Sequence, residues 1–134
     1  MSSPIQWNSS LAIGVGAMDD EHKKLIALME KLYQAEESDA DFKVQAQAFK
    51  ELVHFTKEHF EHEEAYMEKI GYADLEKHKR IHVELLRKAV EYYNAFIESG
   101  RLPSSLFDFL NLWLLSHIKG IDAQYADATN SKAA

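Results

Sequence analysis

Apolar residues follow a helical repeat in four separate stretches of this chain. Within each stretch, apolar side chains recur at spacings of three and four residues, which places them on one face of an α-helix. The stretches cover about residues 19–36, 42–70 and 73–99, and a last one runs from Pro103 until Gly120. Short connections between amphipathic helices favour antiparallel neighbours. The sequence therefore predicts an all-α fold, an antiparallel up-down-up-down four-helix bundle.

The residues before the first repeat have a different character. Residues 1–18 contain Pro4, Gly14 and Gly16 and show no sustained helical period, although Trp7 and Leu11 are large enough to anchor them. A chain of 134 residues is the size of a single domain with one core. We therefore expect an N-terminal arm over residues 1–18 that packs on a bundle formed by residues 19–134.

Charge and cysteine content exclude several kinds of partner and site. Acidic residues outnumber basic ones by 22 to 15, so the surface would repel a phosphate backbone, and we expect no nucleic-acid partner. The chain has no cysteine, so any metal must be held by nitrogen and oxygen donors. No basic cluster precedes an apolar run near the N-terminus, and no apolar run reaches the roughly 20 residues that span a bilayer. We expect a cytoplasmic monomer without stable membrane insertion.

Histidine and carboxylate side chains fall on the apolar faces of the predicted helices. Residues four apart on a helix lie about 40° apart around its axis, so a pair with this spacing can reach one metal centre together. Two pairs have this spacing, one at positions 59 and 63 and the other at positions 78 and 82. The full candidate set of metal ligands is His22, His59, Glu63, His78, His82, His117 and Asp122.

This set points to two metal ions rather than one. A single core histidine can satisfy itself with a backbone carbonyl, but several polar groups that converge on one apolar interior need a common partner. Five imidazoles and two carboxylates are too many donors for one tetrahedral zinc and too rich in nitrogen for magnesium or calcium. Two adjacent irons fit the set. If both carboxylates and a solvent oxygen bridge them, the iron with two histidines keeps one vacant position.

The motifs that carry these residues resemble those of the bacterial members of the hemerythrin family. The resemblance extends from Trp7 to about Tyr125, and all seven ligand positions are filled with matching spacing. The matching segments are MDDEH ending at His22, HFEHE from His59 to Glu63, HKRIH from His78 to His82, and HIKGID from His117 to Asp122.

The resemblance assigns a role to each ligand. It implies that His78, His82 and His117 hold a coordinatively saturated iron and that His22 and His59 hold an open one. Glu63 and Asp122 would bridge the two irons together with an oxo or hydroxo group. Dioxygen would bind reversibly at the open iron. The implied role is therefore transport, storage or delivery to an oxygen-consuming enzyme, and the protein itself would not be an enzyme.

Residues near the ligands extend this interpretation. Trp113 and Leu114 precede His117 by four and three residues, so we expect them to wall the oxygen pocket against water, in addition to packing in the core. Oxygen-activating di-iron bundles of the ferritin-like class draw more heavily on carboxylates, so a histidine-rich set favours reversible binding.

Other interpretations use the same residues. A sensor of oxygen, nitric oxide or iron, or a di-iron peroxidase, would need the same ligands and stays open as an alternative. A phosphotransfer module would need a solvent-facing histidine, whereas these are predicted to face inward. His54 is predicted to lie on the surface, His62 has no obvious partner on its own helix, and Glu64 is a poorer ligand candidate than Glu63 because of its spacing from His59.

Overall fold

The computed structural model describes residues 6–118, apart from the side chain of Ser10. Across this part of the chain the elements are helical and no strand is present. A short 3-10 helix precedes four α-helices, and the elements are η1 (Ser9–Leu11), α1 (Gly16–Glu37), α2 (Phe42–Lys69), α3 (Leu75–Ser99) and α4 (Leu106–Ser116).

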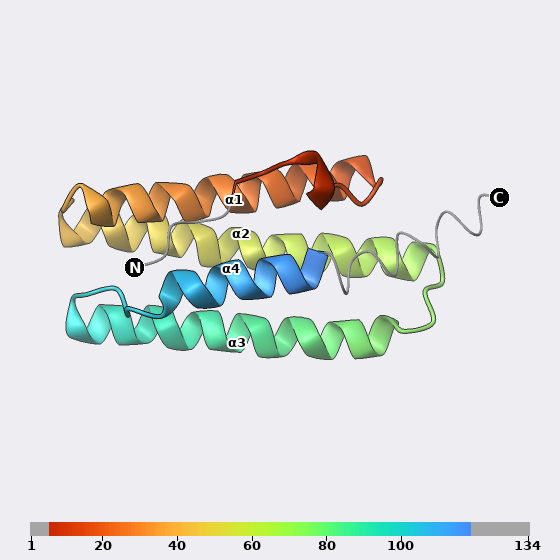
Figure 1. Ribbon diagram of the computed structural model, residues 1–134. Helices are drawn as coiled ribbons and strands as arrows, with labels where there is room; N and C mark the ends of the chain where they lie inside the picture. Colours follow the sequence, from red (N-terminus) through yellow and green to blue (C-terminus); the bar gives the residue numbers. More distant parts are fainter. Residues whose placement is uncertain (1–5, 119–134) are drawn as a thin grey trace.

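Consecutive helices run in opposite directions, as Figure 1 shows. Helix α1 packs against α2, and α2 packs against α3. Helix α4 completes the bundle, and its buried face contributes Leu106, Phe107 and Leu110 to the shared core. The predicted up-down-up-down four-helix bundle is therefore confirmed.

Left-handed residues end three of the helices. Asp39, Gly71 and Gly100 have φ angles of 54°, 67° and 76°. After α1 the Ala40 amide donates to the Ala35 carbonyl at 2.9 Å, and after α2 the Tyr72 amide donates to the Met67 carbonyl at 2.9 Å. These bonds close the helix ends and reverse the chain within a few residues. The connections are therefore as short as the antiparallel arrangement requires.

The helix starts differ from those predicted. Helix α1 begins at Gly16, before the predicted start at Asp19, so the last residues of the predicted arm belong to the helix. The Asp19 carboxylate accepts hydrogen bonds from the amides of Ile13 (2.9 Å) and Gly14 (3.2 Å). Helix α4 begins at Leu106, and Pro103 lies before its first turn.

Apolar side chains fill the bundle in two clusters on either side of the histidine-bearing turns. The larger cluster contains Phe49, Phe96 and Phe107, together with Leu11 from the segment before α1. A smaller cluster is built on Met18 and Met67, one turn outside His22 and Glu63 in the sequence. The polar residues between these clusters are therefore shielded from water on both sides.

No helix within residues 6–118 is both long enough and apolar enough to cross a lipid bilayer.

Candidate metal centre

All four helices send histidine or glutamate side chains into one buried region. His22 lies near the start of α1, Glu63 in the second half of α2, His78 and His82 in the first turns of α3, and His117 directly after α4. Antiparallel packing brings these ends together, because the starts of α1 and α3 meet the ends of α2 and α4 (Figure 1). His59, on α2, is the sixth described ligand candidate, and all six are buried.

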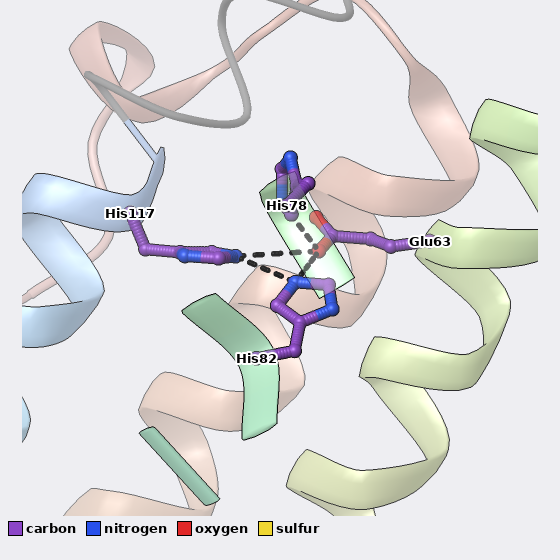
Figure 2. Close-up of side chains that lie close together, drawn as sticks. All are labelled: Glu63, His78, His82 and His117. Carbon is purple, nitrogen blue, oxygen red and sulfur yellow. Dashed lines mark hydrogen bonds and ion pairs between the residues drawn. The ribbon is translucent and has the colours of Figure 1, made fainter. Parts of the chain in front are cut away.

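Three imidazoles surround one oxygen of the Glu63 carboxylate. The Nε2 atoms of His82, His117 and His78 lie 2.9, 3.3 and 3.7 Å from Glu63 Oε1. The Nε2 atoms of His82 and His117 are 3.1 Å apart. Figure 2 shows these rings, from α3 and from the end of α4, converging on the carboxylate from α2. We call Glu63 Oε1 with these rings the three-histidine group.

Two further imidazoles face the other oxygen of the same carboxylate. The Nε2 atoms of His59 and His22 lie 3.4 and 3.6 Å from Glu63 Oε2. Their rings pack edge to face, with centroids 4.8 Å apart. We call Glu63 Oε2 with these rings the two-histidine group. Glu63 is thus shared by two donor clusters, each of which could hold one metal ion.

The donor geometry suits metal coordination. Neighbouring ligands of an octahedral ion with bonds of about 2.1 Å lie about 3 Å apart. Three separations in the three-histidine group, of 2.9, 3.1 and 3.3 Å, are close to this value. His78 at 3.7 Å and the two rings of the other group at 3.4 and 3.6 Å lie further from Glu63. Imidazole nitrogens with one carboxylate are donors that iron accepts, so the described residues fit a pair of irons.

The Glu63 carboxyl is held in its charged form. Burial alone would raise its pKa, but hydrogen bonds from neighbouring imidazoles, His117 and His22 first among them, outweigh burial and hold the pKa of Glu63 well below its usual range. Glu63 is completely buried, so these interactions act in a medium of low dielectric constant. The side chain therefore presents two anionic oxygens, the form that can bridge two cations.

Two carboxylates at the edge of the site orient two of the rings. His59 donates from Nδ1 to Glu21 Oε1 at 2.7 Å, and His82 donates from Nδ1 to Glu64 Oε2 at 2.8 Å. With hydrogen on Nδ1, each ring can direct the Nε2 lone pair toward the centre of the site. Glu21 and Glu64 thus fix both the tautomer and the direction of a candidate ligand, one in each histidine group.

Aromatic rings line the three-histidine group. Phe60 stacks on His82 with centroids 3.9 Å apart and an interplanar angle of 4°. Trp113 lies edge-on to both Phe60 and His117, with centroid distances of 5.8 Å to each. Leu114 is fully buried in the larger apolar cluster. Trp113 therefore lies beside His117, and its role as a wall of an oxygen pocket, like that of Leu114, stays a prediction.

The remaining histidines have partners near the surface. His54 is exposed, as predicted, and its Nε2 lies 2.6 Å from Glu58 Oε1. His62 is also exposed, but its partner is on another helix, because its Nδ1 lies 2.7 Å from Glu21 Oε2. The Glu64 carboxylate contacts Nδ1 of His82, so it does not face the Nε2 atoms as Glu63 does. Asp122 lies outside the described residues, so its part in the site stays a prediction.

Glu21 and Phe60 were not predicted to take part in the site, and Glu64 was predicted only as a weaker ligand candidate than Glu63. The sequence positions of the two glutamates could have indicated a role in the site, because Glu21 directly precedes His22 and Glu64 directly follows Glu63.

Comparison with known proteins places this site in a family. The sequence pattern of the hemerythrin HHE cation binding domain matches residues 13–128. The chain belongs to the hemerythrin family. It is similar to a bacteriohemerythrin of Stenotrophomonas maltophilia, with 33% identity over 121 residues that cover 90% of this chain and 78% of the relative. It is also similar to a myohemerythrin of Riftia pachyptila, with 32% identity and 92% of each chain covered.

Solved hemerythrin structures share the fold. A crystal structure of a hemerythrin point mutant superposes with a TM-score of 0.83 and 24% identity, covering 94% of this chain and 97% of that one. At 24% identity this structural similarity supports the fold and carries no statement about function. The cation-binding description of the family agrees with the two donor clusters around Glu63.

Proposed function

We propose that the protein binds dioxygen reversibly at a pair of iron ions and serves its transport, storage or delivery. The observation that carries the proposal is the position of Glu63, whose two oxygens face three imidazoles on one side and two on the other. A buried carboxylate between two unequal groups of neutral donors suits a bridge between two ions with different numbers of protein ligands.

In this proposal each group holds one iron. The three-histidine group would hold the saturated iron, and the two-histidine group would hold the one with a vacant position. The irons would supply the electrons for reversible dioxygen binding. Asp122 is proposed as the second bridging carboxylate. Glu21 and Glu64 keep Nε2 of His59 and His82 available as donors through the hydrogen bonds at Nδ1.

The apolar surroundings favour reversible binding over turnover. Phe60 and Trp113 cover one side of the site, and the cluster built on Met18 and Met67 closes its outer end. Exclusion of water protects reactive states from hydrolysis and unwanted proton transfer. Three carboxylates, those of Glu63, Glu21 and Glu64, contact the candidate ligands. Of these, Glu63 alone faces the Nε2 atoms.

The test is a cycle of oxygenation. Metal-free protein is loaded with Fe(II) under argon, exposed to air and returned to argon, while the visible spectrum and the dissolved oxygen are recorded. We expect a charge-transfer colour that appears with oxygen, fades on its removal and returns over repeated cycles. Steady consumption of oxygen in the presence of a reductant would instead indicate an oxidase, and steady consumption of hydrogen peroxide would indicate a peroxidase; either result would overturn the proposal.

A further inference from the structure

His62 is an exposed histidine with a direct connection to the buried site. Its side chain is 54% exposed, yet its Nδ1 lies 2.7 Å from Glu21 Oε2. The other oxygen of the same carboxylate, Oε1, accepts a hydrogen bond from His59 Nδ1 at 2.7 Å. A carboxylate that is ionised only accepts hydrogen bonds, so both imidazoles donate to it. Glu21 on α1 is therefore held at both oxygens by two histidines of α2.

The charge state of Glu21 agrees with this arrangement. Burial would raise the pKa of its carboxyl, but the hydrogen bonds from His59 and His62 outweigh burial and leave the pKa below its usual value. The Glu21 side chain is 20% exposed, so water can compete for either oxygen. The hydrogen bond from His62 occupies Glu21 Oε2, so water does not take this place on the carboxylate.

The equivalent carboxylate of the three-histidine group is held differently. Glu64 Oε2 accepts from His82 Nδ1 at 2.8 Å, and His82 is further fixed by the parallel stacking of Phe60. His59 contacts Phe60 only at a centroid distance of 6.0 Å and a tilt of 46°. His59 also packs edge to face against His22 at 4.8 Å, so the neighbouring rings do not cover its face as Phe60 covers His82, and its hydrogen bond to Glu21 bears on its orientation.

We propose that His62 is a positioning residue for the two-histidine group, acting through Glu21 on His59. A glutamate held at one oxygen can still rotate about its terminal bonds, whereas one held at both oxygens has a fixed carboxylate plane. A fixed plane fixes the direction of the His59 Nδ1–H bond and so the direction of Nε2. The inference rests on the proposed function, because the two-histidine group would hold its iron with fewer protein donors and would be more sensitive to a misplaced ring.

The first test uses the metal-free protein and NMR. The Nδ1–H proton of His59 should exchange slowly with water in the native chain, because Glu21 holds it in a buried position. In His62→Ala the exchange should be several-fold faster, and in His62→Gln it should stay near the native rate, because the Gln amide can still donate to Glu21 Oε2. The matched control is His54→Ala, which removes an exposed histidine of α2 paired with Glu58 at 2.6 Å, a contact that reaches no candidate ligand.

The second test measures release of Fe(II) to a chromogenic chelator. Loss of a residue that hydrogen-bonds to a metal-bound histidine lowers metal affinity by about 10- to 100-fold. His62 contacts such a residue, Glu21, and not the histidine itself. We therefore expect a smaller effect, with iron release from His62→Ala roughly 3- to 10-fold faster than from the native chain. His54→Ala and His62→Gln should release iron at the native rate. Because both alanine variants remove only an exposed pair, their melting temperatures without metal should stay close to that of the native chain.

The outcomes separate this inference from the proposed function. If His62→Ala matches His54→Ala in both proton exchange and iron release, His62 does not position His59 and the inference is wrong. If His62→Ala melts at a much lower temperature without metal and His62→Gln fails to restore it, the role of His62 is structural, which also overturns the inference. If the native chain takes up no Fe(II), the proposed function fails, while proton exchange at His59 still decides whether His62 orients the ring.

Discussion

Glu63 is the residue that the two histidine groups share. Its oxygens face Nε2 atoms at 2.9 to 3.7 Å in the three-histidine group and at 3.4 and 3.6 Å in the two-histidine group. It lies one turn after His59 on the same helix, and the spacing of four residues predicted that both would face inward. A single side chain thus determines whether the donors form two connected clusters or two separate ones.

Replacing Glu63 by Ala should remove the coupled pair of metals. Without Glu63, the described donors that remain near each position are imidazoles, and Asp122 would be the one proposed bridging carboxylate left, so we expect iron content to fall from about two per chain to one or fewer. Iron analysis combined with magnetic susceptibility gives the measurement. His54→Ala serves as the control and should keep the native content. Native iron content and coupling in Glu63→Ala would show that another residue is the bridge.

Trp113 should protect the site from water. Trp113→Ala removes a ring that contacts both Phe60 and His117, and we expect the oxygenated colour to bleach faster. The cavity should also lower the free energy of unfolding by about 3–5 kcal/mol. The neighbouring Leu112 is 68% exposed, so Leu112→Ala is a matched control with little effect on either property. Equal bleaching rates for the two variants would remove Trp113 from the pocket wall.

The sequence could predict the inward-facing donors but not their outer partners. His59, Glu63, His78 and His82 follow from the four-residue spacing within one helix and from their place on apolar faces. Glu21 and Glu64 sit one residue away from a candidate ligand, about 100° around the helix, and they reach histidines on neighbouring helices. Their contacts depend on the axial register between helices, which periodicity within one helix does not determine.

At the scale of the helices, the ends were harder to predict than the interiors. Helix α2 begins at Phe42 as predicted, but the side chain of Asp41 makes no capping hydrogen bond. Asp39, two residues before Asp41, takes the left-handed conformation that ends α1. Helix α1 begins at Gly16, because backbone bonds such as Asp19 N to Val15 O at 2.9 Å extend it past the residues with helical periodicity. Packing and tertiary contacts set these ends, and they are only weakly encoded in local sequence.

Gly100 should be needed at the end of α3. Its φ is +76°, and within the described part of the chain no atom beyond its two sequence neighbours lies within 4 Å of the position that a Cβ would occupy, so Gly100→Ala would introduce conformational strain without a clash. We expect the free energy of unfolding to fall by about 1 kcal/mol, as measured by urea denaturation. Gly16 is also free of close neighbours but sits at a helix start, and Gly16→Ala should not destabilise the protein. A Gly100→Ala variant as stable as the native chain would mean that the left-handed turn is not required.

At the scale of the whole molecule, metal binding and folding should be linked. The bundle buries five imidazoles and the Glu63 carboxylate between two apolar clusters, an arrangement that exists only in the folded chain. A ligand that binds only the folded state stabilises it by about 2.7 kcal/mol when its free concentration is 100 times its dissociation constant. The loaded protein should therefore melt at a temperature several degrees higher than the metal-free protein.

Calorimetry with and without iron tests this link. Removal of iron with a chelator should lower the melting temperature, and reloading should restore it. An identical melting temperature in both states, with iron present at the site, would mean that the donors are organised no better in the folded than in the unfolded chain.

An anaerobic titration of the metal-free native chain with Fe(II), followed by absorbance and by iron analysis after desalting, measures how many irons the buried donors hold. We expect an end point at about two irons per chain, because Glu63 joins two donor clusters. An end point at one iron per chain, or a folded chain that retains no iron, would contradict this expectation.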